Sequence, residues 1–399
     1  MIKVYLDNNA TTRPHPEVLE AMRAYQEELY LNASSATGEL LGAARPLADA
    51  RRAMAKLLGA SDDDRIILTS GATEANAWVF RATPPNGHIV TSQVEHSSIL
   101  AAAEQARRRG HPVDLIGVDK NGLILRDELA GLLRPDTRLI SLQLANNETG
   151  AIQPLEELAA LAREIAPDAL FHSDATQAVG RIPIDLGGSL AEVDLLSFSA
   201  HKFHGPKGIG GLMLRDGLTL EPLIPGEQEG GLRGGTSNVA AAAGLAEAAW
   251  ISVARLALKP EISELRDLIE ATILGVDPNV EINAASVARL PNTSSVTIPG
   301  IDADEMVERL ASRGICIATG SACRAGATAP SHVLTAMGIP PLSARSTLRF
   351  SLSGETTADD IKQLLDAIAP LLKSARPEGI AVSESSPSSA SGTGRVMPQ

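Results

Sequence analysis

The sequence of 399 residues has few aromatic side chains and few cysteines. Aromatic residues make up 3% of it, against 44% hydrophobic residues in total, so its core must consist mainly of Ala, Leu, Ile and Val. Its two cysteines, Cys316 and Cys323, are too few for a disulfide framework or a four-cysteine zinc site. The length still allows two domains with a sizeable core.

A basic excess and long apolar runs are also missing. The formal net charge is −13, so the chain lacks the basic character of a nucleic-acid-binding protein, and we expect no direct nucleic-acid binding. No apolar run approaches the roughly 18 residues of a membrane span, and the first residues do not resemble a signal peptide. We therefore expect a reduced, soluble, cytoplasmic protein that makes no membrane contact.

Two common nucleotide-binding motifs are absent, since neither Gly-x-Gly-x-x-Gly nor Gly-x-x-x-x-Gly-Lys-[Ser/Thr] occurs. A dinucleotide or a nucleoside triphosphate is therefore not expected. A predicted strand at 65–69 is instead followed at once by Ser70-Gly-Ala-Thr73 and a helix. The free N–H groups and the dipole of such a helix suit a single phosphate. The plainer alternative is an N-cap made by Thr73 or Ser70.

Strands and helices alternate between residues 65 and 215, which is typical of a mostly parallel sheet covered on both faces. Polar residues follow the ends of five predicted strands. Because ligands bind at the carboxyl edge of such sheets, we expect these residues to share one site. The five residues are Thr73, His96, Asn147, Asp174 and Lys202.

Lys202 lies just past the predicted strand at 193–198, and a glycine-rich run follows it. A lysine beside a buried strand is partly desolvated, which lowers its pKa and makes it a Schiff-base nucleophile. Asp174 lies one strand away, and a carboxylate there suits the protonated nitrogen of a pyridinium ring. The plainer interpretations are a surface lysine and an aspartate that caps a helix.

Several separate motifs together resemble fold-type I pyridoxal-phosphate (PLP) enzymes, in particular class I cysteine desulfurases of the NifS/IscS type. These motifs are Leu6-Asp-Asn-Asn-Ala-Thr-Thr12, Ser199-Ala-His-Lys202, Leu232-Arg-Gly-Gly-Thr236, Ser321-Ala-Cys323, Pro330-Ser-His-Val-Leu334 and Leu348-Arg-Phe350. The resemblance covers roughly residues 4–371. It implies a type I α/β fold, with a mostly parallel sheet in a large cofactor domain and a smaller α+β domain.

The resemblance also implies a role for each candidate residue. The catalytic residues would be Cys323, Lys202 and His96. The cofactor would be held by Ala72, Thr73, His96, Asn147, Asp174, Gln177, Ser199, His201, Lys202 and Thr236. Asn32, Asn147 and Arg349 would bind the substrate, with Arg349 pairing with a carboxylate; alternatively, Arg349 is a surface cation on a strand. Thr236 would reach the phosphate of a partner subunit, so a twofold homodimer is expected.

The chain departs from that family in two places. Ala33 stands where the desulfurases have proline in Asn-Pro-Ser-Ser, and no histidine occurs between Ser34 and Arg45. Glu227 stands where glycine is commoner. The first departure leaves the shape of the loop at Asn32 open.

Three segments are expected. Residues 14–257 would form the large PLP-binding domain, and residues 1–13 with 258–375 the small α+β domain. Residues 376–399 are rich in Ser, Pro and Gly, which predicts a disordered tail.

Cys316 alternates with isoleucines in a predicted strand at 314–319, which indicates a structural role. Cys323 lies beside Arg324 in a run of small residues, where an accessible thiol is biased toward thiolate.

The expected activity is that of a cysteine desulfurase. It would convert L-cysteine to L-alanine and leave the sulfur on Cys323 as a persulfide, for transfer to an acceptor protein in iron–sulfur cluster assembly or in thio-cofactor or nucleic-acid modification. No metal is expected, although Cys323 could transiently ligate an iron–sulfur cluster with a partner. The alternatives are a selenocysteine lyase or cysteine/cystine β-lyase on the same scaffold, and a binding protein whose site has decayed.

Overall fold

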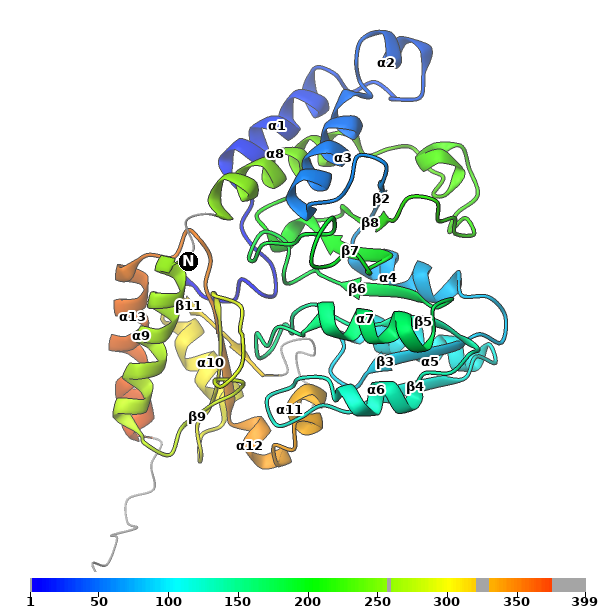
Figure 1. Cartoon of the computed structure of the whole chain (residues 1–399). Coiled ribbons are helices and arrows are strands. Elements are labelled where there is room, and N and C mark those ends of the chain that lie inside the picture. Colours follow the sequence, from blue (N-terminus) through cyan, green and yellow to red (C-terminus); the bar gives the residue numbers. More distant parts are fainter. Residues whose placement is uncertain (1, 257–259, 321–329, 375–399) are drawn as a thin grey trace, which may run out of the picture.

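The computed structural model describes residues 2–256, 260–320 and 330–374 (Figure 1). Its largest element is a seven-stranded sheet in the order β2-β8-β7-β6-β5-β3-β4. Strand β8 runs antiparallel to both neighbours, and the other pairs are parallel. The strands are β2 (Arg65–Thr69), β3 (His88–Ser92), β4 (Val113–Ile116), β5 (Thr137–Ser141), β6 (Leu170–Asp174), β7 (Leu195–Ser199) and β8 (Gly210–Leu214). This confirms the predicted α/β fold of type I.

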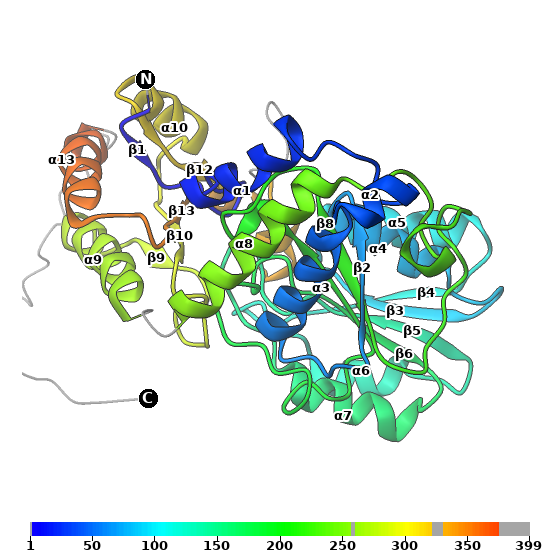
Figure 2. The ribbon, with the colours of Figure 1, turned by 90° about the horizontal axis from the view of Figure 1, so that it is seen from above.

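Helices cover both faces of this sheet (Figure 2). Helices α4 (Ala72–Arg81) and α5 (Ser97–Arg108) share a core cluster on one face. The other face is covered by α1 (Pro16–Glu27), α3 (Arg45–Leu58), α6 (Arg126–Leu132), α7 (Leu155–Ile165) and α8 (Val239–Arg255). Most of the alanine-rich α8 is buried, because its small side chains let it pack closely against α1 and α3. The short α2 (Ala36–Leu40) projects beyond them.

A second, smaller sheet has its own hydrophobic core. Its order is β12 (Ala318–Thr319), β13 (Thr347–Ser351), β10 (Thr293–Thr297) and β9 (Glu281–Ile282), all antiparallel. Helices α9 (Pro260–Val276), α10 (Ala303–Ser312) and α13 (Ala358–Ser374) contribute to that core. Helices α11 (His332–Ala336) and α12 (Pro341–Arg345) lie between β12 and β13 in the chain. We call this part the small-sheet region.

The chain start belongs with the small-sheet region, because β1 (Val4–Tyr5) pairs in parallel with β11 (Ile315–Cys316). The single strand predicted over 314–319 is therefore wrong. It divides into β11, which pairs with β1, and β12, which pairs with β13. Strand β1, at the start of the chain, is in this way paired with a strand that lies between α8 and β13 in the sequence.

Two predictions fall outside the described residues, namely the position of Cys323 and the disordered tail at 376–399. Within the described part of the chain, no helix has the length and apolar character needed to cross a membrane. The same residues contain no group of three or more His, Cys, Asp or Glu side chains that could hold a metal ion.

Candidate active site

A cavity of about 420 Å³ lies where the carboxyl ends of the parallel strands meet the small-sheet region. Ten of the predicted site residues line it, although they are spread over 278 positions of the chain, from 72 to 349. They are Ala72, Thr73, His96, Asn147, Asp174, Gln177, Ser199, His201, Lys202 and Arg349. The shared sheet edge thus brings together side chains that the sequence keeps far apart.

Lys202 ends the short 3₁₀ helix η1 (Ala200–Lys202), which directly follows β7. Its Nζ donates hydrogen bonds to the carbonyl oxygens of Asn9 (2.6 Å) and Ala10 (2.9 Å). The segment before α1 therefore forms one wall of the site beside the lysine. His201 is held next to it by a contact between its Nδ1 and Thr11 Oγ1 at 3.0 Å. Burial, and then the charge of Lys202, lower the pKa of His201 to about 4, so its ring is neutral.

Asp174 is the last residue of β6, and 6% of it is exposed. Its Oδ1 accepts the backbone N–H of Thr176 at 3.0 Å, and its Oδ2 accepts Nδ2 of Asn76 in α4 at 2.8 Å. Because both carboxylate oxygens accept, the side chain is held in one orientation at the cavity wall. Asn76 is a site residue that sequence reasoning missed, since an asparagine inside a helix gives no signal of such a contact.

His96 precedes α5 and caps it with its own ring. Its Nδ1 accepts the backbone N–H of Ser98 at 3.2 Å and contacts Ser98 Oγ at 2.8 Å. Burial is the largest cause of a lowered His96 pKa; Lys202 and His332 add to it, whereas Asp174 opposes it. The ring is therefore neutral near neutral pH.

The turn from β2 into α4 is built on a close approach of two glycines. A Cβ on Gly210 would lie 2.7 Å from the Cα of Gly71, so position 210 has no room for a larger residue. Gly71 is the N-cap residue, which excludes the side-chain cap by Ser70 or Thr73. The backbone N–H of Ala72 donates to Ser199 Oγ at 2.8 Å, which joins the start of α4 to the end of β7.

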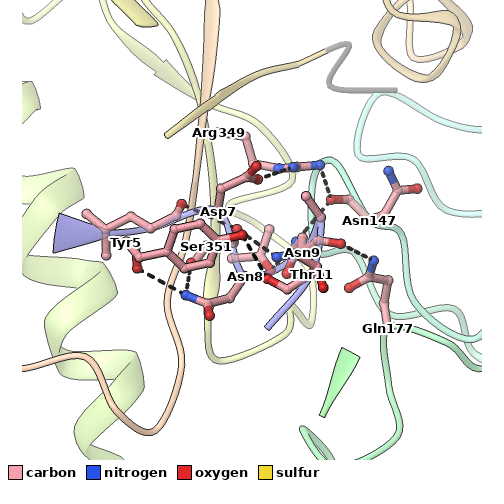
Figure 3. A network of polar contacts seen from close by, with 12 residues as sticks. Tyr5, Asp7, Asn8, Asn9, Thr11, Asn147, Gln177, Arg349 and Ser351 are labelled. Atoms are coloured by element: carbon pink, nitrogen blue, oxygen red, sulfur yellow. Dashed lines mark hydrogen bonds and ion pairs between the residues drawn. The ribbon is translucent and has the colours of Figure 1, made fainter. Parts of the chain in front are cut away.

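Arg349 lies inside β13 and is 1% exposed, so the alternative of a surface cation is wrong. Figure 3 shows its guanidinium between Asp7 and Asn147. One terminal nitrogen lies 2.7 Å from Asp7 Oδ1, and the other donates to the carbonyl oxygen of Asn147 at 3.1 Å. Its buried Nε has no hydrogen-bond partner among the described residues. The guanidinium thus retains a donor for a ligand.

Arg181 is a second buried arginine, and no sequence signal distinguished it. Its guanidinium donates to Asn9 Oδ1 (2.8 Å) and to the backbone oxygens of Asn8 (2.9 Å) and Lys202 (3.2 Å). It also contacts Oε1 of Gln177. Nε2 of Gln177 donates to the carbonyl oxygen of Asn9 at 3.0 Å (Figure 3). Burial, with a smaller effect of Arg349, lowers the pKa of Arg181 to about 9.

Two fully buried carboxyl groups lie directly beside the site. Burial raises the pKa of Glu95 to about 8; the charge of Asp174 raises it further, and hydrogen bonds from Gln143 and Ser92 oppose the shift. Burial likewise raises the pKa of Glu148 to about 7, against the hydrogen bond from Ser331 and the charge of Arg349. Ser331 caps α11, so Glu148 connects this helix to the residues that follow β5. Sequence reasoning missed both groups.

Two predicted residues do not line the cavity within one chain. Asn32 is exposed, and its Oδ1 accepts the backbone N–H of Ser34 in the loop before α2, so the expected substrate contact is not made by the same chain. Thr236 lines a separate cavity of about 200 Å³ with Ser70 and Gly208. Its expected contact with a partner subunit stays a prediction.

The cavity residues suit PLP in the chemistry of their donors. A lysine amine at the end of η1, a buried carboxylate and a helix start match an aldehyde, a ring nitrogen and a phosphate. The N-cap residue Gly71 has no side chain, so no side-chain cap covers this helix start. No residue in the lining conflicts with these three contacts.

Comparison with known proteins identifies the class. The model of the aminotransferase class-V family matches residues 4–364, so the chain belongs to that family. A curated relative, the cysteine desulfurase of Cereibacter sphaeroides, is 44% identical over 94% of this chain and 97% of its own length.

Solved structures agree with this relative. A NifS-like protein superposes with a TM-score of 0.86 at 36% identity, over 94% of this chain and 100% of its own. A structure titled SspA in complex with cysteine superposes at 0.75 and 34% identity, over 88% and 99% of the two chains. Within its family, the chain therefore belongs to the NifS type of enzyme.

Proposed function

We propose that this enzyme is a PLP-dependent cysteine desulfurase. The observation that carries the proposal is the convergence of Lys202, Asp174, His96 and Arg349 on one cavity. The curated relative is a cysteine desulfurase, and a structural neighbour was solved with cysteine. L-Cysteine is therefore the substrate, and its carboxylate has a partner in the buried Arg349.

PLP would be attached through Nζ of Lys202, with Asp174 at its ring nitrogen and Gln177 as a second polar contact. Ala72, Thr73, Ser199 and His201 would hold its phosphate side, His96 its ring face and Asn147 its phenolic oxygen. When bound, PLP supplies an electron sink that weakens the bonds at Cα and Cβ of an amino acid. The lining of the cavity supports this assignment, because each of these residues contributes to it.

Individual residues of the chain would bind the substrate, orient the group that binds it and transfer a proton. Arg349 anchors the substrate carboxylate, since a guanidinium pairs with two oxygens at once. Lys202 would take the α-proton, because its amine lines the cavity and can act there as a base. Asp7 holds Arg349 in place at 2.7 Å. Asn147 orients the same guanidinium through its backbone oxygen.

Cys323 would accept the sulfur, an assignment that rests on its sequence motif because it lies outside the described residues. The substrate Cβ–S bond breaks and an S–S bond forms at Cys323. A proton replaces sulfur on Cβ. One L-cysteine and one enzyme thiol thus yield one L-alanine and one enzyme persulfide, and no outside oxidant or reductant is needed. The persulfide would then pass to an acceptor protein.

We expect L-alanine to accumulate with L-cysteine, and an extra sulfur to appear on the peptide that contains Cys323. Cys323→Ser should retain PLP absorbance and bind L-cysteine, yet release almost no sulfide and carry no persulfide. Cys316→Ser is the matched control, since Cys316 lies in β11 and should affect stability only. Mass spectrometry and alanine analysis give the readouts.

Two results would contradict the proposal. Full sulfide release by Cys323→Ser would indicate a selenocysteine lyase or a β-lyase, which need no persulfide. A purified protein that does not absorb in the near-visible after addition of PLP would indicate a site that no longer binds the cofactor.

The functional unit would be a twofold homodimer in which Thr236 reaches the site of the partner. This part of the proposal comes from the family resemblance and from the position of Thr236 outside the cavity of its own chain. Light scattering at assay concentration tests it, and an active monomer would contradict it.

A further inference from the structure

The contacts of His96 determine which of its two ring nitrogens carries the proton. The backbone N–H of Ser98 lies 3.2 Å from Nδ1, and a backbone N–H can only donate. Nδ1 must therefore be an unprotonated acceptor when the ring is neutral. Ser98 Oγ, at 2.8 Å from the same nitrogen, adds a second donor. A neutral imidazole with an acceptor at Nδ1 carries its proton on Nε2.

The direction of the hydroxyl contact follows from the residues behind it. Nδ2 of the buried Asn76 lies 2.8 Å from Asp174 Oδ2 and 3.0 Å from Ser98 Oγ. A carboxylate only accepts, so the amide nitrogen of Asn76, and not its oxygen, must face Asp174. The same nitrogen then donates to Ser98 Oγ with its other hydrogen. Ser98 Oγ consequently accepts from Asn76 and has its own hydrogen left for His96.

The amide oxygen of Asn76 has no contact that competes with this orientation. Oδ1 is buried and has no hydrogen-bond partner among the described residues. An unpaired buried carbonyl is costly, so the orientation is maintained by the two contacts of Nδ2. The four side chains thus form one directed network that runs from Asp174 through Asn76 and Ser98 to His96.

We propose that Ser98, oriented by Asn76 and Asp174, holds the neutral His96 ring as the Nε2–H tautomer, so that an N–H donor faces the substrate cavity. His96 lines that cavity while its Nδ1 is turned to Ser98. Ser98 and Asn76 are thereby positioning residues. This inference rests on the proposed function only for the identity of the cavity's occupant.

The charged groups around His96 agree with a neutral ring. Lys202 after β7 and His332 on α11 disfavour a second proton, and burial disfavours it most. Asp174 on β6 favours that proton, but its Oδ2 is already paired with Asn76. The adjacent Glu95 is buried, and its raised pKa means that it adds little negative charge near neutrality. Protonation at Nδ1 would also break the cap of α5 and place a cation at a helix N-terminus.

The tautomer limits what His96 can do in the reaction. An Nε2–H group can donate a hydrogen bond to the substrate, but the neutral ring cannot accept a proton there. Acceptance at Nε2 would require moving the proton to Nδ1 and losing both contacts with Ser98. The removal of the α-proton is therefore assigned to Lys202, and His96 serves as a donor to the substrate.

Nuclear magnetic resonance of the holoenzyme labelled with ¹⁵N-histidine tests this directly. Two-bond ¹H–¹⁵N correlations distinguish a protonated ring nitrogen from an unprotonated one, and His96→Gln identifies the signals of His96 among the eight histidines. At a pH where the ring is neutral, we expect Nε2 protonated and Nδ1 unprotonated. A neutral ring with its proton on Nδ1 would overturn the proposal.

Variants then distinguish the contribution of the Ser98 hydroxyl from that of the Ser98 backbone N–H. Ser98→Ala should raise the His96 pKa by roughly half to one unit, because a hydrogen bond to the neutral ring contributes about 0.5–1.5 kcal/mol. Ser98→Thr, which keeps a hydroxyl, should restore the wild-type titration. Gln105→Ala is the control, since Gln105 is exposed on the same helix α5 and does not line the cavity, and it should shift neither nitrogen signal. An unchanged titration in Ser98→Ala would exclude the hydroxyl from this role.

The NMR measurement, combined with an assay for L-alanine, also distinguishes the proposal on His96 from the proposal that the enzyme is a desulfurase. A protonated Nε2 in a protein that makes no L-alanine from L-cysteine would support the network and contradict the desulfurase assignment. L-Alanine production with a protonated Nδ1 would support the desulfurase assignment and contradict the network.

Discussion

The two regions of the molecule contribute to the cavity in different ways. The seven-stranded sheet presents residues from its strand ends, such as Asp174 at the end of β6 and Lys202 just past β7. The small-sheet region contributes Arg349 from the interior of β13, with Asp7 beside it from the chain start. The first set lies on turns that open into the cavity, whereas Arg349 is a cation inside a buried strand.

The sheet edge therefore carries the residues proposed for catalysis, whereas the small-sheet region carries the arginine proposed to bind the substrate. Turns at a sheet edge can hold a lysine, a carboxylate and a histidine around one ligand, because each side chain has its own backbone support. A buried arginine is costly without a partner, so Arg349 requires Asp7 even before a substrate arrives. We therefore expect changes at the sheet edge to act on kcat and changes at Arg349 to act mainly on KM.

The largest effect is expected for Lys202→Ala. Loss of the attached amine and of the base should reduce turnover by roughly 10⁴-fold or more and abolish the near-visible absorbance of the PLP-loaded protein. Lys207→Ala is the control, since Lys207 is exposed nearby and should retain both. Borohydride reduction and peptide mapping locate the attachment, and PLP on a peptide containing Lys207 instead would refute the assignment.

The next effect is expected for Arg349→Lys, which keeps the charge and loses the planar pair of donors. KM for L-cysteine should rise roughly 10- to 100-fold, the equivalent of about 1.5–3 kcal/mol for charged hydrogen bonds, with a much smaller change in kcat. Steady-state kinetics and thermal unfolding are measured together.

Arg289→Lys is the matched control for this variant, because Arg289 forms a buried ion pair with Glu270 in the small-sheet region without lining the cavity. It should lower the melting temperature and leave KM unchanged. Equal changes in KM for the two variants would contradict the claim that Arg349 acts on KM by binding the substrate.

The third effect is on stability rather than on catalysis, and it concerns pH and the buried Glu95 at the sheet edge. Its folded-state pKa of about 8 lies above its ordinary value of 4.5, so the folded state holds this proton more tightly. Stability from Glu95 is therefore fully present below pH 4.5 and is lost as the pH rises through 8. Relative to Glu95→Gln, which stays neutral, the wild type should lose on the order of a few kcal/mol across that range.

Thermal unfolding of both proteins over that pH range gives the difference. Glu104→Gln provides the control, since Glu104 is exposed on α5, and its difference from the wild type should not change in this way. A constant difference between wild type and Glu95→Gln would show that Glu95 is ionised throughout.

Much of the site could be predicted because parallel sheets place ligands at one edge. Strand ends at 69, 92, 174 and 199 can be located from apolar runs followed by polar residues, so Thr73, His96, Asp174 and Lys202 were identified together. Asn76, Ser98, Arg181 and Glu148 were not. Asn76, Arg181 and Glu148 act through contacts with residues distant in the sequence, and such contacts produce no local pattern. Ser98 contacts His96 only two residues away, but the direction of that contact depends on Asn76, which lies 22 positions earlier.

The sequence by itself determined the alternation of strands and helices, the alanine-rich core and the polar residues at the strand ends, because these depend on local periodicity and on turns. Only the tertiary structure decided that β1 pairs with β11, that Asp7 neutralises Arg349, and that Asp174 orients His96 through Asn76 and Ser98. Hydrogen bonds and ion pairs form between whatever groups the folded backbone brings within about 3 Å, and that proximity arises only when the whole chain has folded.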